Sequence, residues 1–234
     1  MPIASLRCAM DASPVTEPVV VAHDVTRVYR VGDETIVAVS QADCTIGPVA
    51  RIGLLGASGS GKSTLMQMLG GIEIPSTGTI TWPALGSRES LRPNAIAFVF
   101  QNRNLVAPLT ALENVELPLV LGGRSQSEAR TIAAQTLARL ELSELGDKLP
   151  EELSGGQAQR IAFARAIAAG PALIFADEPT GQLDTATSER FLTTALAMLD
   201  AGACGLVLAT HDERVAARMT EHWHMEHGEL RTAR

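Results

Sequence analysis

The sequence of 234 residues contains few cysteines, no long apolar run and almost no lysine. Cys8, Cys44 and Cys204 are odd in number and far apart, so neither a disulfide framework nor a paired metal knuckle is indicated. No apolar stretch approaches the ~20 residues that cross a bilayer, and the first residues lack the apolar segment of a signal peptide. We therefore expect a reduced protein that resides in the cytoplasm.

The charge balance argues against a protein that binds nucleic acid. The formal net charge is −7, whereas a protein that binds the nucleic-acid backbone needs clustered lysine and arginine. Nucleic acid is therefore not expected as a partner. Lysine occurs only at Lys62 and Lys148, so the lysine at position 62 indicates a chemical requirement.

Residues 56–64 read Gly-Ala-Ser-Gly-Ser-Gly-Lys-Ser-Thr and fit the phosphate-loop pattern. An apolar strand-like run precedes them and a helical run follows, so backbone N–H groups at the helix start are left to bind phosphate oxygens. We expect the Lys62 ammonium to contact the β- and γ-phosphates and the Ser63 hydroxyl to bind a phosphate-bound Mg²⁺. The expected nucleotide contacts from this loop are Gly56, Ala57, Ser58, Gly59, Ser60, Gly61, Lys62, Ser63 and Thr64.

Polar residues follow three further buried strands. Asp177 and Glu178 end the apolar run 173–176, which suggests one carboxylate for Mg²⁺ and one general base. Gln101 follows the run 95–100, at the strand end where α/β proteins place ligand contacts. His211 follows the run 205–209 and is expected to donate to the γ-phosphate.

Ser154, Gly155, Gly156 and Gln157 form a second helix start that can bind an anion. The phosphate loop already supplies the first such start. The simplest ligand for the second helix start is therefore the γ-phosphate of ATP bound to another copy of the chain. An ordinary serine cap is the alternative.

The order of elements predicts an α/β fold. Residues 1–18 resemble a flexible tail, residues 19–55 have a strand pattern, and alternating strands and helices from residue 173 imply a mostly parallel sheet. Residues 105–123 contain two prolines and are predicted to be irregular or short-helical. A helix is predicted to begin at Ser125, with Glu128 completing its cap, so the region 105–152 is interpreted as a helical insertion.

These motifs together resemble the ATP-binding-cassette ATPases over residues 19–231. The motifs are Walker A at 56–64, the Q-loop Gln101, the signature at 153–157, Walker B at 173–178, the D-loop at 181–184 and the H-loop His211. The resemblance implies that Tyr29 stacks on adenine and that Gln101, with Ser63 and Asp177, serves the Mg²⁺. It also implies a P-loop NTPase core, an N-terminal antiparallel β subdomain and a helical subdomain at about 102–165 within one domain, 19–234.

The resemblance further implies a head-to-tail homodimer or heterodimer that encloses two ATP molecules. Residues 98–102, 109–115 and 177–181 are similar to the lipoprotein-release, macrolide-export and cell-division group. Ala158, where a glutamine is common, and a short 82–95 segment depart from it. The function implied is the ATPase subunit of a transporter, peripheral at the inner face of the cell membrane, with membrane-spanning permease subunits on separate chains.

Two other functions are consistent with parts of the sequence. A soluble cassette ATPase could act on a non-transport complex, but duplicated cassettes, coiled-coil insertions and basic patches are lacking. A non-catalytic nucleotide sensor is disfavoured because Glu178 and His211 are both present. His222, His224 and His227 could suggest zinc, yet exposed strand histidines are the preferred interpretation.

The segment 101–120 is predicted to be the docking surface for the membrane partner, because it holds more apolar residues than a short loop needs. The alternative is that they fold back into the core. The residues concerned are Leu105, Val106, Leu109, Leu117, Leu119 and Val120.

Overall fold

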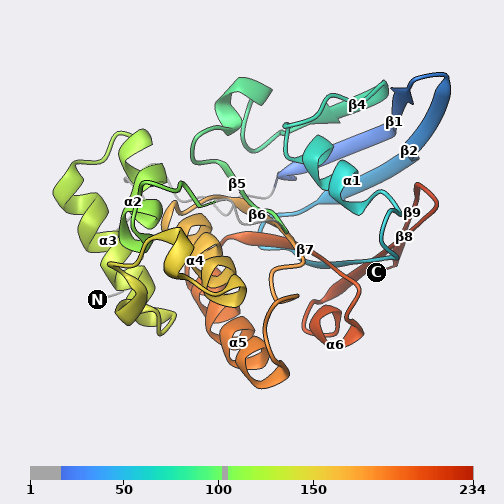
Figure 1. Ribbon diagram of the computed structural model, residues 1–234. Helices are drawn as coiled ribbons and strands as arrows, with labels where there is room; N and C mark the ends of the chain where they lie inside the picture. Colours follow the sequence, from blue (N-terminus) through green and yellow to red (C-terminus); the bar gives the residue numbers. More distant parts are fainter. Residues whose placement is uncertain (1–16, 102–104, 234) are drawn as a thin grey trace. The chain divides into compact units, whose positions relative to one another are not determined.

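The computed structural model describes residues 17–101 and 105–233 (Figure 1). Most of the predicted tail at 1–18 and the residues 102–104 lie outside the described residues. The described chain divides into two compact units, one made of residues 17–92 and 205–233 and the other of residues 93–204. The second unit includes the described part of the predicted helical subdomain and extends beyond it on both sides.

The first unit begins with an antiparallel hairpin. Its two long strands, β1 (Val20–Val31) and β2 (Glu34–Ile46), are joined by a tight turn in which Gly32 has a φ of +61°. Strand β4 (Thr77–Thr81) pairs with the other edge of β1, also antiparallel. These three strands confirm the predicted antiparallel β subdomain.

A buried parallel core continues the same unit. Strand β3 (Arg51–Leu55) lies between β7 (Gly205–Thr210) and β8 (Glu221–Glu226) and is parallel to both. Every residue of β7 is buried, which explains its continuous apolar sequence. The remaining elements of this unit are the helix α1 (Lys62–Leu69), the short helix α6 (Glu213–Ala216), the 3₁₀ turn η2 (Arg88–Leu91) and the strand β9 (Glu229–Ala233), which pairs antiparallel with β8.

The second unit contains two parallel strands and four helices. Strands β5 (Ile96–Val99) and β6 (Leu173–Asp177) pair in register, and the rings of Phe98 and Phe175 stack with centroids 5.2 Å apart. Helix α4 ends at Ala168, and Gly170, which precedes Pro171, takes a φ of +65° in the left-handed region that commonly ends a helix. The helices are α2 (Ala111–Leu121), α3 (Gln126–Arg139), α4 (Gly155–Ala168) and α5 (Thr185–Ala201), with 3₁₀ turns η3 (Ser143–Leu145) and η4 (Pro150–Glu152) between α3 and α4.

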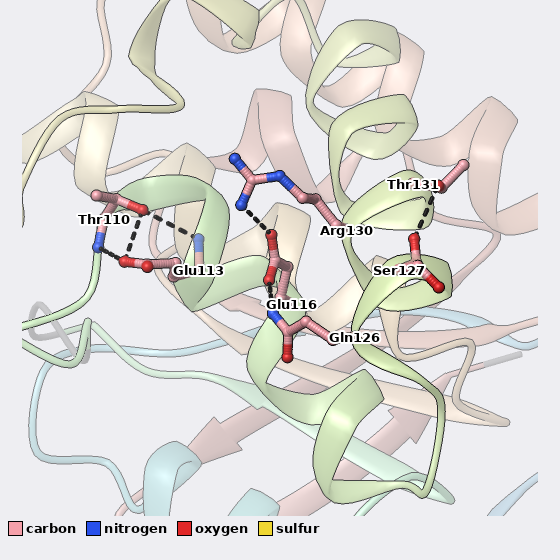
Figure 2. A network of polar contacts seen from close by, with 7 residues as sticks. All are labelled: Thr110, Glu113, Glu116, Gln126, Ser127, Arg130 and Thr131. Atoms are coloured by element: carbon pink, nitrogen blue, oxygen red, sulfur yellow. Dashed lines mark hydrogen bonds and ion pairs between the residues drawn. The ribbon is translucent and has the colours of Figure 1, made fainter.

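The helix starts of this unit are capped by side chains. The predicted cap at Ser125 and Glu128 is present, and Thr110 with Glu113 forms the same reciprocal pair at the start of α2 (Figure 2). Figure 2 also shows Glu116 of α2 held by two side chains of α3. Glu116 accepts a hydrogen bond of 2.6 Å from Gln126 and pairs with Arg130 at 3.4 Å.

Within residues 105–123, predicted to be irregular or short-helical, residues 111–121 form the eleven-residue helix α2, which continues through Pro118. Buried side chains at Ala111, Val115 and Leu119 share one face, and α2 packs against α3 and α4. This burial and the cap offset the cost of the internal proline. Asn114, fully buried, fixes the preceding segment because its amide bonds the main chain at Val106, Leu109 and Thr110.

No helix within residues 17–101 and 105–233 is both long and apolar enough to cross a membrane.

Candidate functional site

The phosphate loop between β3 and α1 requires glycine at several positions, by backbone conformation or by close packing. Gly59 and Gly61 have φ values of +79° and +106°, in the left-handed region that favours glycine. A Cβ at Gly61 would collide with the carbonyl oxygen of Ala38, and one at Gly56 with that of Met225. The backbone of the loop is therefore packed closely against the neighbouring strands, with its peptide groups as the available contacts.

The charged side chain of the loop is folded back over it. The Lys62 ammonium donates to the carbonyl oxygens of Gly56, at 2.7 Å, and Ala57, at 2.9 Å. Helix α1 starts at Gly61 with no side-chain cap, and the hydroxyl of Ser60 is buried without a partner. Uncapped N–H groups, an orphan hydroxyl and a lysine together fit the phosphates of a nucleotide.

The strand registers place other predicted residues of the first unit. Leu55 of β3 pairs with Thr210 of β7, so the phosphate loop and His211 leave neighbouring strands at the same edge. Tyr29 lies on β1, half-buried, with the guanidinium carbon of Arg27 4.6 Å from its ring centroid. Arg27 in turn pairs with Glu73. The aromatic ring is thus oriented by a cation that is itself anchored.

A cavity of about 350 Å³ lies beside the phosphate loop in this unit. Residues 55–60 line one side, and the end of β8 with the following His227 lines the other, so that His224 and His227 both border the cavity. His222 points elsewhere and contacts the carbonyl oxygen of Ala216 at 3.1 Å. Within the described residues no three His, Cys, Asp or Glu side chains are grouped to hold a metal. The parallel pairing of Leu55 with His224 brings the two segments together, and local sequence does not reveal it.

The second unit holds the acidic pair and Gln101. Asp177 ends β6, and Glu178 follows with a φ of +48°, which is unusual for a residue with a side chain. Strand β5 pairs with β6 through Val99 and Ala176, so Gln101, exposed, and the acidic pair follow neighbouring strands at one edge. This edge fits the expectation that both contribute to one ligand site.

The signature segment 153–157 begins helix α4. The Ser154 hydroxyl accepts from the Gln157 N–H at 3.3 Å, and the Gln157 side chain accepts from the Ser154 N–H at 2.9 Å. Gly156 has no room for a side chain, because a Cβ there would lie 2.9 Å from the carbonyl oxygen of Gln182. The D-loop, residues 181–184, therefore rests directly on the first turn of the signature helix.

One residue of this site escaped the sequence motifs. Gln159 of α4 is buried, and its amide nitrogen donates to the carbonyl oxygen of Glu178 at 2.5 Å. The only sequence signal is its position two residues after Gln157 on the buried face of a helix. Each unit thus carries its own set of predicted residues, with Tyr29 and His211 accompanying the phosphate loop in the first.

Comparison with known proteins identifies the family. The family model described as ABC transporter matches residues 39–181. The lipoprotein-releasing system ATP-binding protein LolD of Chromohalobacter salexigens is 35% identical over 88% of this chain and 90% of its own length, and LolD of Pseudomonas fluorescens is 38% identical over 89% and 95%. The macrolide export protein MacB of Hyphomonas neptunium is 41% identical, but this chain spans only 33% of its length.

Solved structures agree in fold. The dimeric bacterial ABC transporter cassette MJ0796 superposes with a TM-score of 0.85 at 36% identity, covering 92% of this chain and 98% of that one. A dimer of the same cassette in a post-hydrolysis state with ADP and Pi gives a TM-score of 0.84 at 35% identity. The predicted fold class and resemblance are confirmed. The chain belongs to the ABC transporter family and is a nucleotide-binding ATPase cassette of that family.

Proposed function

We propose that the chain hydrolyses ATP with Mg²⁺ in a head-to-tail dimer, and that this dimer serves membrane-spanning subunits carried on separate chains. The phosphate loop carries the proposal, because Lys62 is buried against loop carbonyls that phosphate oxygens can replace as its partners. Similarity to the LolD relatives, which are named ATP-binding proteins of a lipoprotein-releasing system, supports the role of an ATPase subunit.

Within the site, each side chain has a distinct task. Ser63, Asp177 and Gln101 are the oxygen donors that would hold Mg²⁺, which neutralises charge on the phosphates when bound. Glu178 accepts the proton of the attacking water, and His211 donates to the γ-phosphate. Tyr29, steadied by Arg27, stacks on the adenine, and the loop residues 56–64 bind the phosphates.

The second copy supplies the signature. The start of α4 presents Ser154 and Gly155 at a fourteen-residue helix, whose N-terminal dipole favours an anion. The dimeric MJ0796 cassettes support a dimer of this chain as well. We therefore assign Ser154, Gly155, Gly156 and Gln157 to the γ-phosphate of the ATP bound by the partner copy.

The membrane partner is proposed to dock on the surface formed by Gln101 and residues 105–120, at the inner face of the membrane. Val106 and Val120 are each 38% exposed and the adjoining Leu121 is 66% exposed, while Leu119 is buried in the packing of α2. The exposed apolar side chains support docking of a partner. Leu119 instead agrees with the alternative that these residues fold back into the core. Leu105, Leu109 and Leu117 are half-buried, so each lies partly in the packed interior of this unit and partly on its surface.

Replacing Glu178 with glutamine tests the function. The amide keeps the shape and accepts a hydrogen bond but cannot take a proton, so ATP binding should persist while turnover falls by about 100-fold or more. Glu144→Gln, an exposed carboxylate on η3, is the matched control and should leave turnover unchanged. Turnover near the parent rate in Glu178→Gln would show that another group is the base.

A further inference from the structure

Gln159 occupies a position that packing alone does not explain. Its side chain is 6% exposed, its amide nitrogen donates to the Glu178 carbonyl oxygen at 2.5 Å, and its amide oxygen has no partner. An unpaired buried oxygen costs free energy, whereas a methionine of similar volume would fill the space without that cost. A glutamine here therefore needs a reason other than filling the core.

The first reason is the conformation of Glu178. Its φ of +48° lies in the left-handed region, which a residue with a side chain keeps only when its surroundings hold it. Two donors meet its carbonyl oxygen, namely the Gly181 N–H at 3.1 Å and the Gln159 amide. The first belongs to the local turn, and the second ties that turn to the signature helix.

The second reason is a small cavity that Gln159 lines. It has a volume of about 10 Å³, roughly enough for one water molecule. Gln101 and Gln182 also line it, and Phe100 and Ala158 are among its apolar neighbours. A water in this cavity could donate to the unpaired Gln159 oxygen and also bond polar groups of the Q-loop and the D-loop.

We propose that Gln159 is a positioning residue for ATP hydrolysis. It fixes the main chain of Glu178 directly, and through one bound water it links that carbonyl to Gln101 and Gln182. The signature helix, the Q-loop and the catalytic carboxylate are thereby held in one arrangement within residues 93–204. This proposal rests on the proposed role of Glu178 as the general base.

Two substitutions separate positioning from packing. Gln159→Met keeps the volume and removes both hydrogen bonds, and Gln159→Glu keeps an oxygen but loses the amide donor. We expect kcat to fall by about 10- to 100-fold in Gln159→Met, because a base displaced by about 1 Å loses that much rate, while KM for ATP changes less than twofold. Gln135→Met, on the exposed face of α3, is the matched control and should match the parent in both constants.

The pH profile gives a readout that packing would not change. In Gln159→Glu a carboxylate repels the Glu178 carbonyl oxygen, whereas the protonated acid can donate to it. The kcat of this variant relative to the parent should therefore rise as the pH is lowered from 8 to 6. A flat ratio would contradict the direct hydrogen bond.

The outcomes distinguish the two proposals. If Glu178→Gln abolishes turnover but both folded Gln159 variants keep kcat within twofold of the parent, the positioning role is wrong and the proposed function stands. If the Glu178→Gln protein hydrolyses ATP at the parent rate, the proposed role of Glu178 is wrong, and the positioning role of Gln159 is wrong with it. If neither Gln159 variant folds, Gln159 is a core residue and the proposal is overturned. A high-resolution crystal structure of the parent with no water density near the Gln159 amide oxygen would remove the water link.

Discussion

Gly156→Ala is a sharp test of how the D-loop rests on the signature helix. Alanine stabilises a helix interior by ~1 kcal/mol relative to glycine, and in the first turn, where Gly156 lies, the gain is at most that large. Here the new Cβ would lie 2.5 Å from the Leu183 Cδ2 and 2.9 Å from the Gln182 carbonyl oxygen, and both distances are shorter than real Cβ contacts. Overpacking of this kind costs about 2–3 kcal/mol, because a backbone carbonyl cannot rotate away as a side chain can.

The net effect should be a loss of about 1–2 kcal/mol in the free energy of unfolding, after the helix gain is subtracted. Urea unfolding followed by circular dichroism measures it on the isolated protein, without reference to ATP. Leu183→Ala in the same chain removes only the methyl clash, so the double variant should recover part of the loss and show a coupling of at least ~0.5 kcal/mol. A Gly156→Ala protein as stable as the parent would show that the D-loop does not press on this turn.

Three further predictions concern other parts of the chain. Lys62→Ala should weaken ATP binding itself, measured by calorimetry, because the mobile charge over the phosphate loop is lost. ATPase activity should rise faster than linearly with dilute protein concentration, and strict proportionality across the monomer to dimer range in sedimentation would oppose shared sites. Burial raises the pKa of Glu116 above its ordinary value, with Arg130 opposing the shift, so folding binds a proton there and stability falls as pH rises through the raised pKa. Glu116→Gln should flatten that fall in urea unfolding measured between pH 4 and 7.

Much of the fold could be predicted from local sequence signals. The helix starts at Ser125 and Ser154 depend on a few adjacent residues, and both were predictable from them. The extent of helix α2 was not, because Pro118 argues locally against a helix that continues past it. The face that buries Val115 becomes visible only once α3 and α4 are in place.

The site residues also fall into those that adjacent sequence predicts and those that depend on distant parts of the chain. Lys62 and its loop could be predicted as a candidate site because consecutive residues form the strand, the glycine-rich loop and the helix start. Gln159 was missed because its partner, Glu178, lies nineteen residues away and on another element. His224 was assigned to an exposed strand, and only the pairing of β8 with β3 places it beside the phosphate loop. The comparisons establish the family, while the roles of the individual side chains remain predictions of this chemistry.

The contacts within residues 93–204 bear on how two sites in the proposed dimer would communicate. The signature at Ser154 is assigned to the partner's ATP, whereas Glu178 is assigned to the ATP of its own chain. Gly156 meets the D-loop, and Gln159 bonds the Glu178 carbonyl, so the signature and the base are parts of one packed assembly. If both assignments hold, we expect a displacement of the signature helix by one nucleotide to shift the base that acts on the other nucleotide. Linkage requires that this coupling be reciprocal in binding free energy, so each bound nucleotide affects the affinity of its counterpart equally.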